Sequence, residues 1–130
     1  MSETLKERIV QRIVRNLLDI IILQMISNQP MWGYKIKKEI ENTYGIKIRH
    51  GALYPLLNML ENSGYLRSKQ EKHGGRIRKV YEITSKGIQY VDAYYNFLKE
   101  QLQMKKSEIT VGKQNEKRIS ILRHAARKTN

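Results

Sequence analysis

The sequence predicts a mainly α-helical fold that contains one small β-hairpin. Helical periodicity of apolar residues is visible in three segments before residue 64 and in a further segment after residue 84. Between these segments lies a basic stretch in which apolar residues alternate with polar ones, with Gly74 and Gly75 as a turn signal. These patterns predict three helices, a hairpin and a final long helix, in that order.

A capping signal at Thr4 predicts the start of the first helix. Glu7 follows three residues later, which is the spacing of a capping box. Apolar residues then recur at helical spacing over residues 9–26, so we expect one helix that ends in the Ser-Asn-Gln-Pro sequence of residues 27–30. The apolar face over residues 17–26 is broad enough for burial against the core and against a second subunit.

Two further helices are predicted over residues 32–44 and 51–63. Gly45 fits the left-handed position that ends the first of them. Pro55 lacks a backbone N–H, so it requires either that the second of them starts only a few residues upstream or that this helix bends. The expected core stripe of that helix consists of Leu53, Leu56, Leu57 and Leu60.

The hairpin is predicted from residues 65–70 and 77–83. Ile77, Tyr81 and Ile83 share one face at a period of two, and the glycine pair between the strands supplies the turn. Six basic residues lie between positions 67 and 79, against Glu71 alone. The hairpin is therefore expected to be a positively charged wing.

The final helix is expected to begin at Thr84 as its cap. Its apolar residues are spaced three, four, three and four apart, which is a heptad seam that breaks at Lys105. We expect the seam to join two copies of the chain, although a helix that covers its own domain would carry a similar pattern. The expected seam residues are Ile88, Val91, Tyr95, Leu98 and Leu102.

The charge of the chain favours a polyanionic partner. There are 25 Lys and Arg residues against 12 Asp and Glu, a formal net charge of +13 over 130 residues. Hydrophobic residues make up 40% of the sequence, which is enough for a folded core. The absence of cysteine excludes disulfides and cysteine-based zinc sites. With no signal-peptide pattern and no apolar run longer than residues 20–23, we expect a cytoplasmic protein without a membrane partner.

Three helices, a two-stranded wing and a long C-terminal helix make a winged helix-turn-helix domain with a dimerisation helix. We expect a winged-helix DNA-binding domain over residues 1–84, a dimerisation helix over 85–110 and a basic tail over 111–130. Three motifs carry a family resemblance: Gly33-Tyr34-x-Ile36; Gly51-Ala52-Leu53-Tyr54-Pro55-x-Leu57 with Leu60-Glu61 and Gly64-Tyr65-Leu66; and Gly75-Arg76-x-Arg78-Lys79-x-Tyr81-x-Ile83-Thr84-x-x-Gly87.

With these motifs in this order, the sequence resembles the PadR-like family of transcriptional regulators over roughly residues 17–102. It looks like the shorter type, which has a single C-terminal helix. The resemblance implies a homodimeric repressor that occupies promoter DNA. Some drug-sensing relatives carry a tryptophan in the C-terminal helix, whereas this chain has Tyr90, Tyr94 and Tyr95 there, so any small-molecule effector remains unidentified.

A helix-turn-helix protein presents the start of its recognition helix to base edges in the major groove. Here that start offers Arg49, His50 and Ala52, with Asn58 further along the exposed face. Arginines of the wing suit a narrow minor groove, while lysines and tyrosine hydroxyls suit phosphates. The expected DNA-contacting residues are Tyr34, Lys35, Arg49, His50, Ala52, Tyr54, Asn58, Arg76, Arg78 and Lys79.

The expected function is therefore sequence-specific binding of double-stranded DNA by a homodimer at a pseudo-palindromic operator. The alternative is an architectural, chromatin-type protein with little sequence preference, which the net charge and basic tail would also suit. A winged-helix module that binds another protein is a more distant alternative. No cofactor is expected, the lone His50 makes no case for a metal, and no catalytic motif predicts an enzyme.

Overall fold

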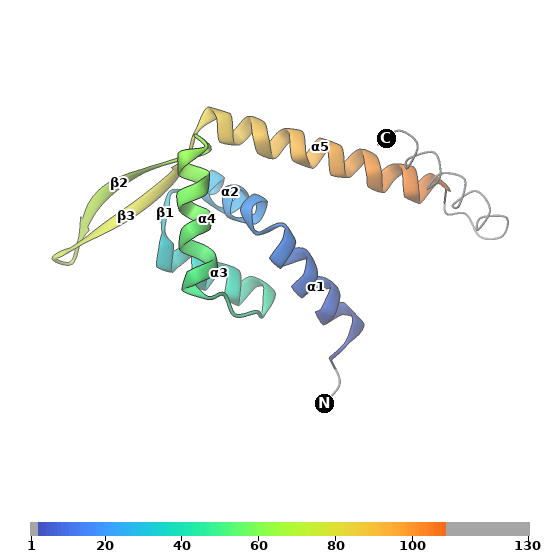
Figure 1. The fold of residues 1–130 in the computed structure, drawn as a ribbon, viewed down its shortest axis with the longest axis horizontal. Helices are drawn as coiled ribbons and strands as arrows, with labels where there is room; N and C mark the ends of the chain where they lie inside the picture. Colours follow the sequence, from blue (N-terminus) through green and yellow to red (C-terminus); the bar gives the residue numbers. More distant parts are fainter. Residues whose placement is uncertain (1–2, 109–130) are drawn as a thin grey trace. The chain divides into compact units, whose positions relative to one another are not determined.

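The computed structural model describes residues 3–108 of the chain (Figure 1). The described residues up to Asp92 form one compact unit, and those from Ala93 to Glu108 belong to another. The predicted basic tail over 111–130 lies outside the described residues, as do the last two residues of the predicted 85–110 helix. The elements are α1 (Leu5–Asn16), α2 (Leu18–Asn28), β1 (Met31–Trp32), α3 (Gly33–Tyr44), α4 (His50–Asn62), β2 (Leu66–His73), β3 (Arg76–Ile83) and α5 (Ser85–Glu108).

The capping box at the start of α1 is confirmed, but the prediction of one continuous first helix is wrong. Thr4 and Glu7 each accept a hydrogen bond from the other's backbone amide, both at 3.1 Å. The helix breaks at Leu17, whose φ of −113° and ψ of 24° are not helical. The break has a packing reason: α2 is buried on most of its circumference, including Ile20 and Ile22, whereas α1 is amphipathic with a half-exposed face.

The two predicted central helices are confirmed within one residue of their expected bounds as α3 and α4. Gly45 ends α3 in the left-handed region, with φ 66°. Pro55 lies inside α4, five residues after its first residue, and no break follows. The carbonyl that loses its helical partner to Pro55 belongs to Gly51, which is exposed, so water can solvate it.

The hairpin is confirmed and is longer than predicted, with β2 and β3 paired from Leu66↔Ile83 to His73↔Arg76. Gly74 and Gly75 both have positive φ, at 57° and 81°, as a type I′ turn requires. The sequence did not predict β1, because two residues after a proline are too few to show an alternating pattern. β1 adds to β3, where Met31 pairs with Tyr81 and Trp32 with Val80, so the sheet order is β1-β3-β2.

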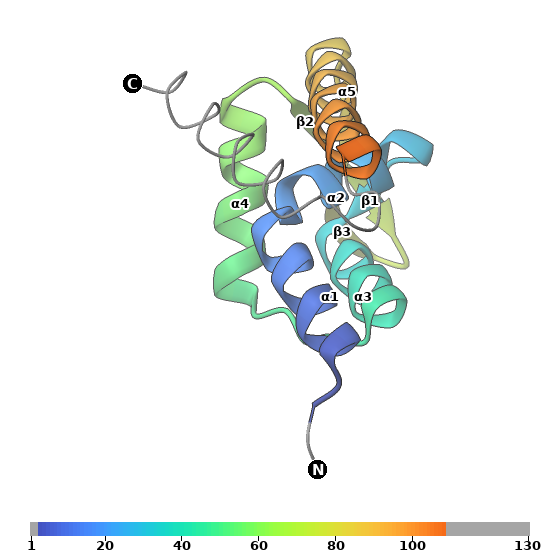
Figure 2. The same ribbon diagram turned by 90° about the vertical axis from the view of Figure 1, so that its right-hand side faces the viewer.

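The core of the first unit lies where α2, α3, α4 and the sheet meet (Figures 1 and 2). Three of the four leucines predicted for the α4 core stripe are fully buried, and Leu56 is partly buried. The burial of these apolar side chains is the main term that stabilises so small a unit. The buried cluster consists of Val14, Ile22, Leu23, Ile26, Met31, Ile36, Ile40, Ile48, Leu53, Leu57, Leu60, Leu66 and Tyr81.

Thr84 caps α5, as predicted, and also fastens it to the loop after α4. The Thr84 hydroxyl accepts the backbone N–H of Gly87 at 3.0 Å and donates to the Gly64 carbonyl at 2.6 Å. The rings of Tyr65 and Tyr90 stack with centroids 4.4 Å apart. A Cβ at position 87 would lie 2.3 Å from the Tyr65 carbonyl oxygen, so only glycine permits this approach. Among the described residues, no helix combines the length and the apolar character needed to span a membrane.

Candidate nucleic-acid interface

A groove opens in the first unit between the start of α3, the exposed face of α4 and strand β3. Its volume is about 500 Å³. Six of the ten residues predicted to contact DNA line it, although they come from three separate segments of the sequence. The lining residues are Trp32, Gly33, Tyr34, Tyr54, Asn58, Arg76, Ile77, Arg78, Lys79 and Tyr81.

The floor of the groove depends on a close approach between α3 and α4 at Gly33. A Cβ at position 33 would lie 2.7 Å from Cε1 of Tyr54, so a side chain there would push the ring away. Tyr34 and Tyr54 are both exposed at the groove. Trp32 is the N-cap of α3 and provides no side-chain hydrogen bond to the first turn. The two exposed phenol hydroxyls are therefore available as donors on this face.

Arg78 and Trp32 form a cation–π stack along the groove. The guanidinium carbon of Arg78 lies 3.8 Å from the centroid of the Trp32 ring, and the Tyr34 ring lies 5.3 Å from Trp32. Arg78 is half-buried as a result, whereas Arg76, nearer the turn, is exposed. The two wing arginines, which the sequence could not tell apart, thus have different surroundings.

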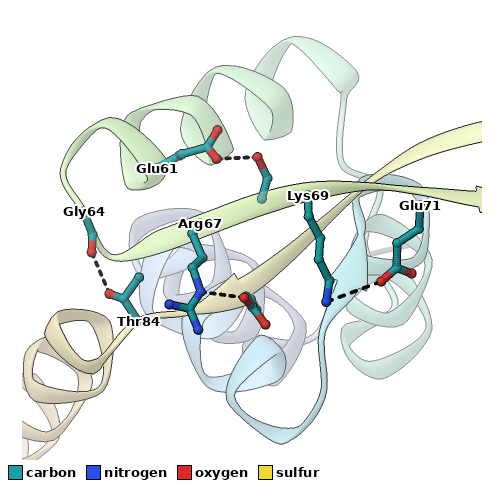
Figure 3. A network of polar contacts seen from close by, with 8 residues as sticks. Glu61, Gly64, Arg67, Lys69, Glu71 and Thr84 are labelled. Atoms are coloured by element: carbon teal, nitrogen blue, oxygen red, sulfur yellow. Dashed lines mark hydrogen bonds and ion pairs between the residues drawn. The ribbon is translucent and has the colours of Figure 1, made fainter.

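Glu61, near the end of α4, contacts both strands of the hairpin, and Figure 3 shows its contact with β2. Its Oε2 accepts a hydrogen bond from the Ser68 hydroxyl in β2, and its Oε1 lies 3.0 Å from Nζ of Lys79 in β3. The Ser68 hydrogen bond and the nearby Lys79 ammonium lower the pKa of Glu61 below its usual 4.5. The same contact raises the pKa of Lys79 above 10.5. Both groups are therefore charged at neutral pH.

The remaining basic residues of the hairpin fall into two kinds. Arg67 pairs with Glu82 at 2.5 Å, and Lys69 lies 3.7 Å from Glu71 (Figure 3). Lys72 and Arg76 have neither an ion pair nor a ring contact within residues 3–108. Both flank the glycine turn, so the free positive charge of the hairpin is concentrated at its tip.

Arg49 and Ala52 do not line the groove but a separate cavity of about 470 Å³ at the start of α4. Arg15 and Lys47 add two further cations to its lining. The carboxylate of Glu41 accepts the backbone N–H of Ile48 at 2.9 Å, which lowers the pKa of Glu41 and holds the loop that leads to α4.

His50 and Lys35 lie apart from both hollows. The His50 ring stacks on Tyr54, with centroids 5.6 Å apart and an interplanar angle of 15°. Lys35 is partly buried in α3. On the next turn of that helix, Lys38 places its ammonium 5.5 Å from the ring centroid of Tyr34. The predicted contact residues are therefore divided between the groove, the cavity at the start of α4 and two positions outside both.

Four residues that line the groove were not predicted as site residues: Trp32, Gly33, Ile77 and Tyr81. Glu61 was also not predicted, because acidic residues are not expected at a DNA interface. Gly33 and Tyr81 both belong to the motifs on which the family resemblance rests, and that membership could have identified them as site residues. No sequence signal predicted the Trp32–Arg78 contact, because the two residues are 46 positions apart and meet only through the pairing of β1 with β3.

The predicted seam residues follow one side of α5. In the first unit, Ile88 is exposed and Val91 packs against the core. In the second unit, Tyr95 and Leu102 are exposed, and with Leu98 they line an apolar hollow of about 280 Å³.

Within the described residues, no group of three or more His, Cys, Asp or Glu side chains could hold a metal ion.

Comparison with known proteins gives a consistent result. Residues 22–93 match the model of the transcriptional regulator PadR-like family. A transcriptional regulator of Mycobacterium tuberculosis is 35% identical over 66 residues, which cover 51% of this chain and 61% of that relative.

Solved structures agree with the sequence match. A PadR family transcriptional regulator from Eggerthella lenta has a TM-score of 0.62 and 28% identity, over 79% of this chain and 92% of that chain. PadR of Bacillus subtilis, solved in complex with operator DNA, has a TM-score of 0.57 and 23% identity, over 61% of this chain and 46% of that chain. The predicted winged helix-turn-helix fold and the family resemblance are both confirmed.

Proposed function

Because this chain belongs to the PadR-like family of transcriptional regulators, we propose that it represses transcription as a homodimer bound to a specific DNA operator. The observation that carries the proposal is the groove, which gathers aromatic hydroxyls and basic side chains beside the exposed face of α4. The alternative of a DNA coater explains the net charge equally well, but it requires no such arrangement beside a recognition helix.

In this proposal α4 enters the major groove of the operator. Asn58 is exposed on α4 and is of a type that pairs with adenine, while Arg49 stands at the helix start, where guanine or a phosphate is in reach. His50 and Ala52 flank Arg49 on the same exposed end. Of these residues, Asn58 and Arg49 are proposed to carry most of the sequence discrimination.

Phosphates on either side would be held by the groove and by α3. Tyr34 and Tyr54 present hydroxyls beside the first turn of α3, where uncapped backbone amides favour an anion. Lys35 lies in that first turn and adds positive charge. Arg76, exposed next to the glycine turn, is proposed to enter the adjacent minor groove.

The homodimer is proposed from the apolar row on α5. Ile88, Tyr95 and Leu102 are exposed large apolar side chains at heptad spacing, and water contact with such a row is unfavourable. Leu98, together with the part of Val91 that its own core leaves exposed, completes the proposed interface. A two-fold dimer would present two copies of α4 to half-sites about one helical turn apart, which is the reason to expect a pseudo-palindromic operator.

Selection from a library of random-sequence duplexes tests the proposal. The wild-type protein should enrich a motif with two-fold symmetry and prefer it to a scrambled duplex by about 10³-fold or more at physiological salt. A promoter that contains the motif should be transcribed less when the protein is added. Equal affinity for the enriched and scrambled duplexes would instead favour the architectural protein.

A further inference from the structure

We propose that Glu61 is a positioning residue for DNA recognition and that Lys79, its partner, braces the hairpin instead of binding a phosphate. The three residues Glu61, Ser68 and Lys79 are called the Glu61 bridge below. This inference rests on the proposed function, because it concerns how α4 and the hairpin are held for binding one DNA duplex.

The geometry of the Glu61 bridge joins three elements through one carboxylate. Glu61 lies near the C-terminal end of α4, and its two oxygens are engaged separately, by the Ser68 hydroxyl and by the Lys79 ammonium. Ser68 belongs to β2 and Lys79 to β3, so each strand of the hairpin is tied to α4 by its own contact. A rotation of the hairpin about its own axis would break one contact or the other.

Within the Glu61 bridge, the carboxylate of Glu61 neutralises the positive charge of Lys79. At neutral pH the carboxylate and the ammonium are both ionised and lie 3.0 Å apart, so together they add no net charge. A phosphate contact by Lys79 would have to break this pair or leave the carboxylate of Glu61 beside a phosphate. Counterion release, which drives non-specific binding, gains nothing from a charge already neutralised.

A second contact holds the hairpin from the opposite side. Trp32 is tied to β3 by pairing with Val80, and its ring lies under the guanidinium of Arg78. Lys79 and Arg78 are neighbours in β3 and therefore point to opposite faces of the sheet. The base of the hairpin is thus held on one face from α4 and on the other from β1, while Arg76, near the tip, has no ion pair or ring contact within residues 3–108.

These contacts fix the angle between the hairpin and α4, and this angle determines where Arg76 lies. Arg76 is three residues beyond Lys79, or about 10 Å at the rise of a β-strand. A hairpin tilt of about 6° would shift it by about 1 Å, which exceeds the roughly 0.5 Å within which a binding contact must be held. Loss of the Glu61 bridge should therefore reduce discrimination between sequences more than it reduces affinity for DNA in general.

A charge swap tests the inference. Glu61→Lys, Lys79→Glu and the double variant are compared with wild type on two probes: the duplex enriched by wild type and a scrambled duplex of equal length and composition. Each single variant should lose preference for the enriched duplex by about tenfold or more, because a like-charge pair replaces an opposite-charge pair. The double variant, which restores the pair with its charges exchanged, should recover the preference to within about threefold of wild type.

The inference is overturned if the double variant stays as weak as Lys79→Glu alone, because a phosphate contact cannot be rescued at position 61. Circular dichroism and thermal unfolding establish that each variant is folded. If wild type itself shows no preference for any selected duplex, the proposed function fails, and the inference fails with it. If wild type shows the preference but the swap gives no rescue, only the inference fails.

A neutral version of the bridge gives an independent measurement should the swapped variants fail to fold. Glu61→Gln with Lys79→Gln removes one charge of each sign, so the salt dependence of binding to the scrambled duplex should equal that of wild type. Arg76→Gln is the matched control: it removes a cation with no ion pair among the described residues, so it should reduce the slope of log affinity against log salt by up to about 0.9, the value for one phosphate contact. An equal reduction in the neutral double variant would show that Lys79 contacts a phosphate and would overturn the inference.

Discussion

The helices α4 and α5 have similar apolar patterns but different surroundings. Both carry large apolar residues every three or four positions on one side. On α4, Leu53, Leu57 and Leu60 are at most 1% exposed, because α2, α3 and the sheet cover them. On α5, Tyr95 and Leu102 are 56% and 66% exposed within the single chain. The same pattern is therefore covered internally in α4, whereas in α5 beyond Asp92 the described residues leave Tyr95 and Leu102 exposed.

The difference shows what apolar periodicity can establish. It identifies the side of a helix that avoids water, but it does not identify what covers that side. For α4 the cover comes from the same compact unit, which residues up to Asp92 form. For α5 beyond that residue, a second copy of the chain is the cover that we propose, and variants of the two helices can test the distinction.

The largest effect is expected from Leu98→Asp on α5. If the seam joins two subunits, two unpaired carboxylates would be buried in an apolar contact, at a cost of about 3–5 kcal/mol of dimer stability. Sedimentation should then show a monomer with an unchanged circular dichroism spectrum. Asn96→Asp, on another side of the helix, is the control and should leave the dimer intact. A wild type that is already monomeric at micromolar concentration would contradict the dimer.

Leu57→Ala on α4 should act on folding and not on assembly. The side chain is fully buried, so its truncation should cost about 2–5 kcal/mol in free energy of unfolding. Denaturant titration at fixed protein concentration measures the loss. Met59→Ala, which changes an exposed residue of the same helix, should cost much less. Equal costs at the two positions would mean that α4 is covered differently from the arrangement described.

A smaller effect is expected from the exposed face of α4. Asn58→Ala should weaken binding to the enriched duplex by about 1–3 kcal/mol if the amide reads a base, with little change on scrambled DNA. Asn62→Ala is the matched control, because the same residue type is exposed on the same helix but does not line the groove. Titration of both variants against both duplexes gives the comparison. Similar losses for Asn58 and Asn62 would remove Asn58 from the proposed set.

The smallest effect concerns pH and the end of α4. The pKa of Glu61 is lowered from 4.5 in the folded protein, so its stabilising contribution is present above that value and is lost as pH falls through the folded-state pKa. The pKa of Lys79 is raised above 10.5, so its contribution is lost only as pH rises through still higher values. Thermal unfolding of wild type and Glu61→Gln should therefore converge on acidification. A gap that stays constant down to about pH 3 would contradict the lowered pKa.

Much of the fold was predictable because its signals are local. The capping box at Thr4, the left-handed Gly45 and the Gly74–Gly75 turn each depend on a few adjacent residues, and all three are confirmed. The break at Leu17 was not predictable in this way. The residues on both sides of it continue a helical pattern, and the difference in burial between α1 and α2 arises only when the core assembles.

The candidate site was predictable in residue types but not in their pairing. Charge and motif positions pointed to Arg76, Arg78 and Lys79 as one group. In the folded chain Arg78 stacks on Trp32 and Lys79 pairs with Glu61, whereas Arg76 has no ion pair or ring contact with any described residue. These partners come from β1 and α4, and tertiary contacts of this kind leave no periodic signal in the sequence.

The Trp32–Arg78 stack also gives the protein an internal optical probe. Trp32 is the single tryptophan of the chain and lines the groove, so indole fluorescence reports on the groove without background from another tryptophan. A guanidinium close to the ring should shift and partly quench its emission. Titration with unlabelled DNA should therefore change the fluorescence wherever Arg78 moves relative to the ring. The protein can thus be followed in solution without a dye and without a substitution at its surface.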